Sequence, residues 1–246
     1  MKNPTWQRDE LILALDLYFR LEPGQIHGRN ELIVDLSEVL NTLPIHPPEQ
    51  RNRKFRNANG VGLKLSNFLA IDPEYEGKGM KRYGKLDQKI FLEFQNDQDR
   101  LHQIAEKIKR TIEDEDVVHK LYLMDEEEDR LPLWEVKEGK VLYKLHKYRE
   151  RNQTIVKEKK EQFFKDHKAL FCEACTFDFE RKYGELGKGY IECHHRFPLA
   201  ENTIEQVTAL ADLAFVCANC HRMLHRDISH LNIESLRVKI KLNGLL

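Results

Sequence analysis

Four cysteines in the last third of the sequence stand in two C-x-x-C pairs. The pairs are Cys172 with Cys175 and Cys217 with Cys220. Each pair can present two thiolates from one tight turn, and four thiolates form the closed tetrahedral shell that a structural zinc ion prefers. Two coincidental pairs of buried cysteines are the alternative, but both pairs have ligand spacing and lie in one small region. We therefore predict a structural zinc site, which leaves no open position for a substrate.

Four histidines lie within and just after this frame. His194 and His195 are adjacent within the apolar stretch from Tyr190 to Leu199, which has the pattern of a strand. His221 and His225 follow the last cysteine at i, i+4 spacing, which places both imidazoles on one face of a helix. Three imidazoles that converge from a strand and a helix can hold a divalent cation. A fourth that points away from the cation can act as a base on water.

This arrangement resembles the HNH, or ββα-metal, nucleases, and especially the HNH domains of McrA-like modification-dependent restriction enzymes. The resemblance rests on three motifs between Cys172 and His225: C-x-x-C, then I-E-C-H-H-x-x-P-L, then D-L-A-F-V-C-x-N-C-H-x-x-x-H. It implies metal-dependent hydrolysis of DNA phosphodiester bonds, which leaves 5′-phosphate and 3′-hydroxyl ends.

The resemblance also implies a role for each matching residue. His195 corresponds to the general base that deprotonates the attacking water, while His194, His221 and His225 correspond to the ligands of the catalytic metal. Asp212 stands where the family has its central asparagine, nine residues before His221. An aspartate can still accept the hydrogen bonds that pin the hairpin loop and orient the base. Three imidazoles suit several transition metals, whereas magnesium prefers oxygen ligands, so Mg²⁺, Mn²⁺, Ni²⁺ and Zn²⁺ all stay open as the catalytic ion.

A role in defence follows from the same resemblance, namely restriction of foreign DNA, with cytosine-modified DNA as a candidate target. One HNH domain carries one metal centre and cuts one strand, so a double-strand cut requires two protomers or two events, which favours a homodimer. Two alternatives stay open. A non-catalytic zinc-ribbon protein would bind DNA without cleaving it, although a ribbon needs only the cysteines. An HNH nuclease with a homing role or an RNA substrate would keep the chemistry and change the target.

Length and composition indicate an ordinary globular protein. The 246 residues, 41% of them hydrophobic, suffice for one sizeable core or two modest domains. No segment approaches the roughly 20 apolar residues of a membrane helix, and the polar start MKNPTWQRDE lacks the apolar stretch of a signal peptide. We therefore expect a cytoplasmic protein without membrane association. In that reducing compartment the paired cysteines suit a metal better than a disulfide framework.

The formal net charge of −1 hides a strong asymmetry along the chain. Residues 113–130 hold nine acidic and two basic side chains, whereas residues 137–168 hold eleven basic and five acidic ones. The field near a local patch depends on how charges are distributed, so a neutral total does not argue against a polyanionic partner.

The first part of the chain has helical periodicity. Apolar residues recur at helical spacing from Trp6 to Phe19, from Glu31 to Leu40 and from Gly60 to Leu69, and a further helix is expected from Leu86 to Arg110. The first three helices weakly resemble trihelical Myb or helix-turn-helix modules, whose third helix reads the major groove. A packing or dimerisation domain is the alternative. The resemblance would give DNA contacts to Arg53, Arg56, Asn59, Lys64 and Asn67.

A basic helix or helix pair from Val141 to Lys168 leads into the first cysteine pair. Its cations would neutralise phosphates and give salt-dependent affinity, and a solvated helix with paired charges is the alternative. The predicted contacts are Lys147, Arg149 and Arg151, because this stretch also resembles McrA-like HNH proteins. Arg196, beside the histidine pair, is a further candidate phosphate contact, with an ordinary exposed arginine as the alternative.

The sequence therefore predicts an α+β protein with three parts. Residues 1–110 form a mostly helical DNA-recognition domain, and residues 111–136 form an acidic linker. Residues 137–246 form a C-terminal domain in which the basic helix precedes a zinc-stapled ββα-metal nuclease.

Overall fold

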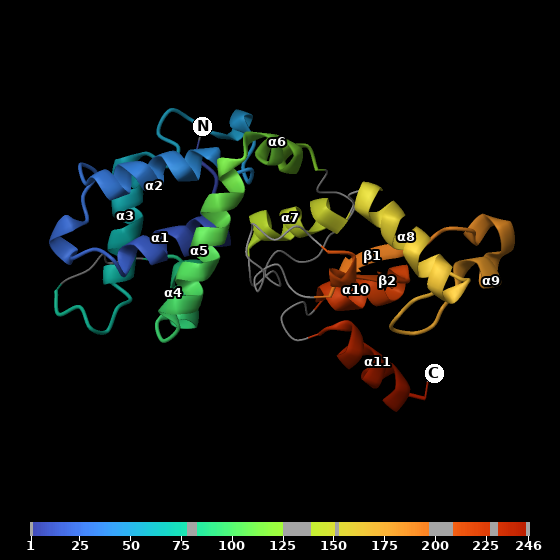
Figure 1. The fold of residues 1–246 in the computed structure, drawn as a ribbon. Helices are drawn as coiled ribbons and strands as arrows, with labels where there is room; N and C mark the ends of the chain where they lie inside the picture. Colours follow the sequence, from blue (N-terminus) through green and yellow to red (C-terminus); the bar gives the residue numbers. More distant parts are fainter. Residues whose placement is uncertain are drawn as a thin grey trace. The chain divides into compact units, whose positions relative to one another are not determined.

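The computed structural model describes residues 2–77, 83–124, 139–150, 153–196, 209–226 and 231–244, without the side chains of residues 146, 149 and 150 (Figure 1). Among these, residues 2–124 and 139–144 belong to one compact unit, the N-terminal unit, and the residues from 145 onward belong to a second, the C-terminal unit. The described chain is mostly helical with one small sheet, which confirms the predicted α+β class. Each of its helices is too short or too polar to cross a bilayer.

The N-terminal unit is built around one buried helix, α1 (Arg8–Tyr18), with Leu11, Ile12, Leu13, Ala14 and Leu15 fully buried. A helix that is apolar on all sides needs neighbours on all sides. Figure 1 shows them around α1: α2 (Glu31–Thr42), α3 (Ala58–Leu69), α4 (Lys85–Phe94) and α5 (Gln98–Glu113). Two short 3-10 helices, η1 (Pro23–Gln25) and η2 (Pro48–Gln50), lie in the loops that flank α2.

The first three predicted helices form as α1, α2 and α3, but the fourth prediction was wrong in its extent. The stretch from Leu86 to Arg110 contains α4 and α5, because Asp97 breaks the helix and caps a new one. Its side chain accepts a hydrogen bond from the backbone nitrogen of Arg100 at 3.4 Å. Part of the predicted acidic linker is also helical: α6 (Glu115–Leu123) buries Leu121 completely.

A buried ion pair ties α1 to the loop before α3. The carboxylate of Glu10 accepts hydrogen bonds from Nε and a terminal nitrogen of Arg56 at 2.6 and 2.9 Å, and it lies 3.2 Å from Nε2 of His46. Burial alone would raise the pKa of Glu10, but the hydrogen bonds from His46 and Arg56 outweigh burial and lower this pKa. Arg56 also donates to the backbone carbonyls of Pro4 and Thr5, so one guanidinium fastens three segments.

The basic helix α7 (Lys140–Glu150) begins on the N-terminal unit. The fully buried carboxylate of Asp9 accepts hydrogen bonds from the backbone nitrogens of Lys140 and Val141, at 2.7 and 2.8 Å. Burial raises the pKa of Asp9, and these hydrogen bonds oppose that rise. Gly139 precedes the helix at φ +96°, and a Cβ there would lie 2.4 Å from an Asp9 oxygen. The first turn of α7 therefore belongs to the N-terminal unit. The sequence instead predicts that the whole basic helix belongs to the C-terminal domain, beginning at residue 137.

The C-terminal unit surrounds a two-stranded antiparallel sheet. Strand β1 (Glu192–His195) pairs with β2 (Leu213–Val216), so that His194 lies opposite Ala214. One face of the sheet packs on α8 (Gln153–His167), and the other packs on α10 (Ala218–Arg226) and α11 (Ile233–Leu242). The connections contain α9 (Phe179–Tyr183) and the 3-10 helices η3 (Gly184–Gly187) and η4 (Leu210–Asp212).

Candidate functional site

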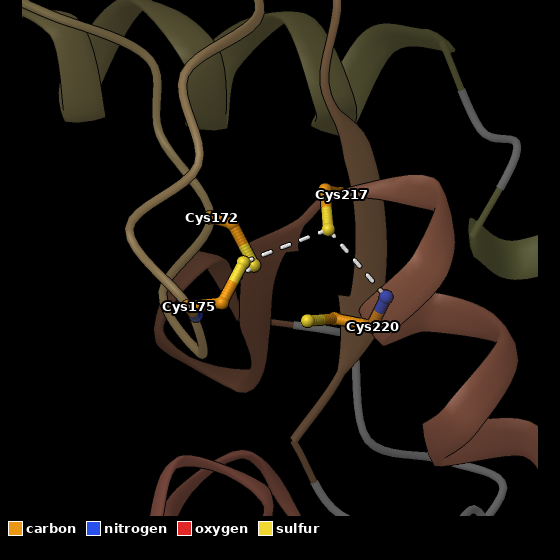
Figure 2. Close-up of side chains that lie close together, drawn as sticks. All are labelled: Cys172, Cys175, Cys217 and Cys220. Carbon is orange, nitrogen blue, oxygen red and sulfur yellow. Dashed lines mark hydrogen bonds between the residues drawn. The ribbon is translucent and has the colours of Figure 1, made fainter. Parts of the chain in front are cut away.

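The four paired cysteines come together at one end of the sheet. Figure 2 shows their side chains gathered around one point, and the four sulfur atoms all lie within 4.8 Å of one another. Cys172 and Cys175 lie in the turn before α9, whereas Cys217 and Cys220 join β2 to α10. The backbone nitrogens of Cys175 and Cys220 donate to the sulfurs of Cys172 and Cys217, at 3.4 and 3.5 Å.

The crowding of these sulfurs favours a bound cation. Hydrogen bonds from Cys217 and Cys220 lower the pKa of Cys172 to about 2, so one thiolate forms readily. Hydrogen bonds with Cys172, which has the larger effect, and with Cys217 raise the pKa of Cys220. Four thiolates therefore need a cation that neutralises their charge. The sulfurs of Cys175 and Cys217 lie 3.7 Å apart, close to the spacing of about 3.8 Å that tetrahedral Zn–S bonds impose. The cluster could thus hold the predicted structural zinc ion.

Three of the four motif histidines form a second cluster. His194 comes from β1, and His221 and His225 come from one face of α10. Their ligand nitrogens lie within 4.8 Å of one another, and the Nε2 atoms of His221 and His225 are 2.9 Å apart. Three imidazoles can hold a transition-metal ion while leaving further coordination positions open, as a catalytic ion requires. This donor set fits a catalytic ion, in contrast to the closed shell of the cysteines.

Glu192 belongs to this site, although the sequence reasoning missed it. Its Oε2 accepts a hydrogen bond from Nδ1 of His221 at 2.6 Å, and its Oε1 accepts one from the hydroxyl of Tyr190 at 3.3 Å. The hydrogen bond with His221 lowers the pKa of Glu192, against the effect of burial. Period-two alternation could have found it, because Glu192 precedes His194 by two residues and faces the same side of the strand. A carboxylate behind a ligand histidine fixes the ring and its tautomer.

His195 and Asp212 lie at the far end of the hairpin. His195 ends β1, is buried, and faces the side of the sheet opposite to His194, because successive residues of a strand alternate. The backbone carbonyl of Asp212 accepts a hydrogen bond from the backbone nitrogen of Arg196 at 2.7 Å. The side chain of Asp212 accepts one from the backbone nitrogen of Ala209 at 2.9 Å. The backbone of Asp212 thus joins the strand ends next to His195, while the predicted role of its side chain in orienting His195 stays a prediction. Residues 197–208 between the strands lie outside the described chain.

The predicted DNA contacts of the C-terminal unit have different surroundings. The guanidinium of Arg196 pairs with Glu173 in the first cysteine turn, and it lies 3.4 Å from Glu234 of α11. A phosphate would therefore compete with two carboxylates for this side chain. Lys147 lies half-buried on α7. The side chain of Arg149 and the whole of Arg151 lie outside the described residues.

Most predicted DNA contacts of the N-terminal unit serve its own structure. Arg56 is buried on Glu10, so the prediction that it contacts DNA does not hold. Both carboxylate oxygens of Asp87 on α4 accept from Nζ of Lys64 at 2.9 Å, and one also accepts from the amide of Asn67 at 3.1 Å. The polar face of α3 is therefore covered by α4, which does not favour a recognition helix. Two of the predicted contacts are exposed, Arg53 and Asn59.

A third group of potential ligands lies in the N-terminal unit. Atoms of Asp16, His102 and Glu106 lie within 4.8 Å of one another. Two cations already neutralise the carboxylates, because Arg20 donates to Asp16 at 2.8 Å and Lys109 donates to Glu106 at 2.8 Å. A metal ion would have to displace them, so we assign no metal to this group.

Comparison with known proteins agrees with the geometry of the C-terminal unit. Residues 172–227 match the family model described as HNH endonuclease. No curated protein and no solved structure matches the chain. The matched segment begins at the first cysteine of the cysteine cluster and extends just past His225, so it contains both candidate metal sites. The chain therefore carries an HNH endonuclease domain, and such a domain acts on nucleic acid.

Proposed function

We propose that this chain, with its HNH endonuclease domain at residues 172–227, is a metal-dependent endonuclease that hydrolyses DNA phosphodiester bonds. One observation carries the proposal: a histidine cluster separate from the cysteine cluster, with ligand atoms of His194, His221 and His225 within 4.8 Å of one another. A zinc ribbon that only binds DNA needs the four cysteines alone. A second set of ligands that leaves coordination positions open on its ion favours a catalytic role.

The reaction assigns one task to each group. His194, His221 and His225 would hold a divalent cation, which when bound stabilises the negative charge that develops on the phosphate and the leaving oxygen. His195 accepts a proton from water as the water oxygen forms its bond to phosphorus. The bond from phosphorus to the 3′ oxygen breaks, and this oxygen leaves as a hydroxyl once protonated. Asp212 holds the hairpin that carries His195.

Cleavage of supercoiled plasmid tests the proposal. Full-length protein is incubated with Mg²⁺, Mn²⁺, Ni²⁺ or Zn²⁺, and nicked and linear products are separated on agarose. Wild type should nick in at least one metal, and His195→Ala should lose this activity. His119→Ala is the matched control, because His119 is an exposed histidine of the N-terminal unit, and it should cleave like wild type. Folded, metal-loaded wild type that binds DNA and cleaves nothing would support the zinc-ribbon alternative.

The finer proposal is a cytoplasmic restriction enzyme that acts on foreign DNA, with cytosine-modified DNA as a candidate target. It is supported by the likeness of the three motifs to McrA-like enzymes. Parallel assays on unmodified plasmid, cytosine-modified plasmid and RNA would separate this target from the homing and RNA alternatives. Equal cleavage of both plasmids would argue against a modification-dependent enzyme. Sedimentation with and without DNA would test the homodimer that a double-strand cut favours.

A further inference from the structure

One loop of the C-terminal unit exposes several large apolar side chains beside two cations. It runs from α9 through η3 to the start of β1. Tyr183, Leu186 and Tyr190 are 54%, 90% and 51% exposed. Arg181 and Lys182 precede Tyr183 and are exposed as well. We call these five residues the hairpin surface, because their loop leads into the β1–β2 hairpin, although all five precede β1. Apolar side chains gathered on a surface mark an interaction site more often than scattered single ones do.

The loop under this surface is held in a defined shape. The ring of Phe179 packs against the rings of both Tyr183 and Tyr190, with centroids 6.1 and 4.7 Å away. Gly187 lies so close that a Cβ there would come within 2.0 Å of the Phe179 carbonyl oxygen. Gly184 turns the chain at φ +63°. Leu186 is therefore presented from a packed frame, which lowers the entropy cost of binding through it.

Hydrogen bonds connect the hairpin surface to the candidate metal site. The hydroxyl of Tyr190 donates to Glu192 at 3.3 Å, and Nδ1 of His221 donates to the same carboxylate at 2.6 Å. The exposed ring of Tyr190 thus lies one carboxylate away from a ligand of the catalytic ion. A strand whose cleaved phosphate lies at the histidine cluster has its neighbouring nucleotides within reach of this ring.

The charges around the loop suit a polyanion. Arg181 and Lys182 both project into solvent, with Glu180 as the exposed acid beside them. The other acidic groups have local partners: Asp178 caps α9 by accepting from the backbone of Arg181 at 2.9 Å, and Glu185 pairs with Lys188 at 3.0 Å. The cations next to Tyr183 can therefore approach phosphates.

We propose that the hairpin surface binds the DNA next to the cleaved phosphate, an inference that rests on the proposed function. Arg181 and Lys182 contact phosphates, while Tyr183, Leu186 and Tyr190 lie against sugars and base edges in the minor groove. Apolar side chains combined with cations are the usual composition of minor-groove contacts. The surface would then set how the strand is positioned over the histidine cluster.

The proposal is tested by fluorescence anisotropy, which measures DNA binding by the zinc-loaded full-length protein with no further divalent metal added. Two matched pairs of variants are compared. Leu186→Ala is compared with Leu242→Ala, because Leu242 is an 81% exposed leucine on α11 of the same unit. Leu186→Ala should bind DNA roughly tenfold more weakly than wild type, because it lacks the apolar contact of one leucine. Leu242→Ala should bind like wild type.

The charge pair is tested through salt dependence. Arg181→Ala/Lys182→Ala is compared with Lys239→Ala/Lys241→Ala, which removes two exposed cations from α11. Each lost phosphate contact reduces the slope of log K against log salt by about 0.9, so the first double variant should flatten the slope by nearly two units. The second should leave it unchanged. Zinc content and circular dichroism check that every variant is folded.

The outcomes separate this proposal from the proposed function. If wild type cleaves DNA, and Leu186→Ala and the Arg181/Lys182 double variant both bind and cleave like wild type, the hairpin proposal is overturned and the nuclease stands. If wild type binds without cleaving and Leu186→Ala loses binding, the hairpin surface is a DNA-binding surface, but the nuclease fails and with it the placement beside a cleaved phosphate. A change in sedimentation of Leu186→Ala with intact DNA binding would assign the surface to protein contacts and overturn the proposal.

Discussion

Nδ1 of His221 donates a hydrogen bond to Oε2 of Glu192 at 2.6 Å, and this leaves Nε2 of the same ring facing Nε2 of His225 at 2.9 Å. The hydrogen bond fixes the tautomer in which Nε2 carries the lone pair, as a metal ligand requires. It also lowers the pKa of Glu192, so the carboxylate is ionised at neutral pH.

Glu192→Gln should weaken metal binding at the histidine cluster, because a neutral amide holds the imidazole less firmly. Loss of such a partner typically costs about 10- to 100-fold in metal affinity or activity. Affinity is measured by titrating metal into protein whose cysteine cluster is already filled, and nicking rates are measured in parallel. Glu185→Gln is the control, because Glu185 is exposed and its ion pair is with the exposed Lys188. Equal metal affinity in Glu192→Gln and wild type would contradict the positioning role.

Cys217→Ser should remove one zinc equivalent and lower the melting temperature of the C-terminal unit. The ion that the four thiolates share contributes its binding free energy to folding. Metal content is measured by mass spectrometry after gel filtration, and unfolding is followed by circular dichroism. Cys193→Ala is the matched control: Cys193 is buried on β1 outside the cysteine cluster, so its loss should leave the zinc content unchanged. Full zinc retention by Cys217→Ser would exclude Cys217 as a ligand.

Glu10 makes the stability of the N-terminal unit depend on acid pH. The pKa of Glu10 in the fold lies below its ordinary value of 4.5, so its ionised form stabilises the fold at neutral pH. That contribution is lost as the pH falls below 4.5 and through the folded pKa. Urea unfolding between pH 7 and pH 3 measures the effect. Glu10→Gln should destabilise at neutral pH by about 3–5 kcal/mol, since it leaves Arg56 buried without its charge partner, and should flatten the acid dependence. Glu31→Gln, at an exposed position, should leave both unchanged.

Asp9→Ala should loosen the start of α7. Two backbone N–H groups, of Lys140 and Val141, would lose their acceptor, and each buried donor left unsatisfied costs about 1–3 kcal/mol. Hydrogen exchange at these two amides should accelerate, and the urea midpoint of the N-terminal unit should fall. Asp35→Ala, on the exposed side of α2, serves as the control. Unchanged exchange at both amides would show that Asp9 does not hold the helix.

The two clusters of potential metal ligands could be predicted from the sequence because ligand identity and spacing are local properties. Each C-x-x-C pair and the i, i+4 histidine pair has a geometry fixed by its local backbone. The pairing of β1 with β2 then brings the first cysteine pair and His194 to the second cysteine pair and α10. The partners of charged side chains could not be predicted in this way. Arg56 and Glu10 are far apart in sequence, and Lys64 meets Asp87 only because α4 packs on α3. Tertiary packing decides whether an arginine faces solvent or a buried carboxylate, and helical periodicity carries no information about that choice.

Helix α10 begins next to the cysteine cluster and carries two of the three clustered histidines, with Cys220 and His221 as neighbours in the chain. The same turn of α10 therefore places the sulfur of Cys220 in the cysteine cluster and the imidazole of His221 in the histidine cluster. The geometry of the histidine cluster should therefore depend on an intact cysteine cluster. If the chain is the proposed nuclease, an oxidant that joined two of the thiols in a disulfide would abolish cleavage without modifying any histidine.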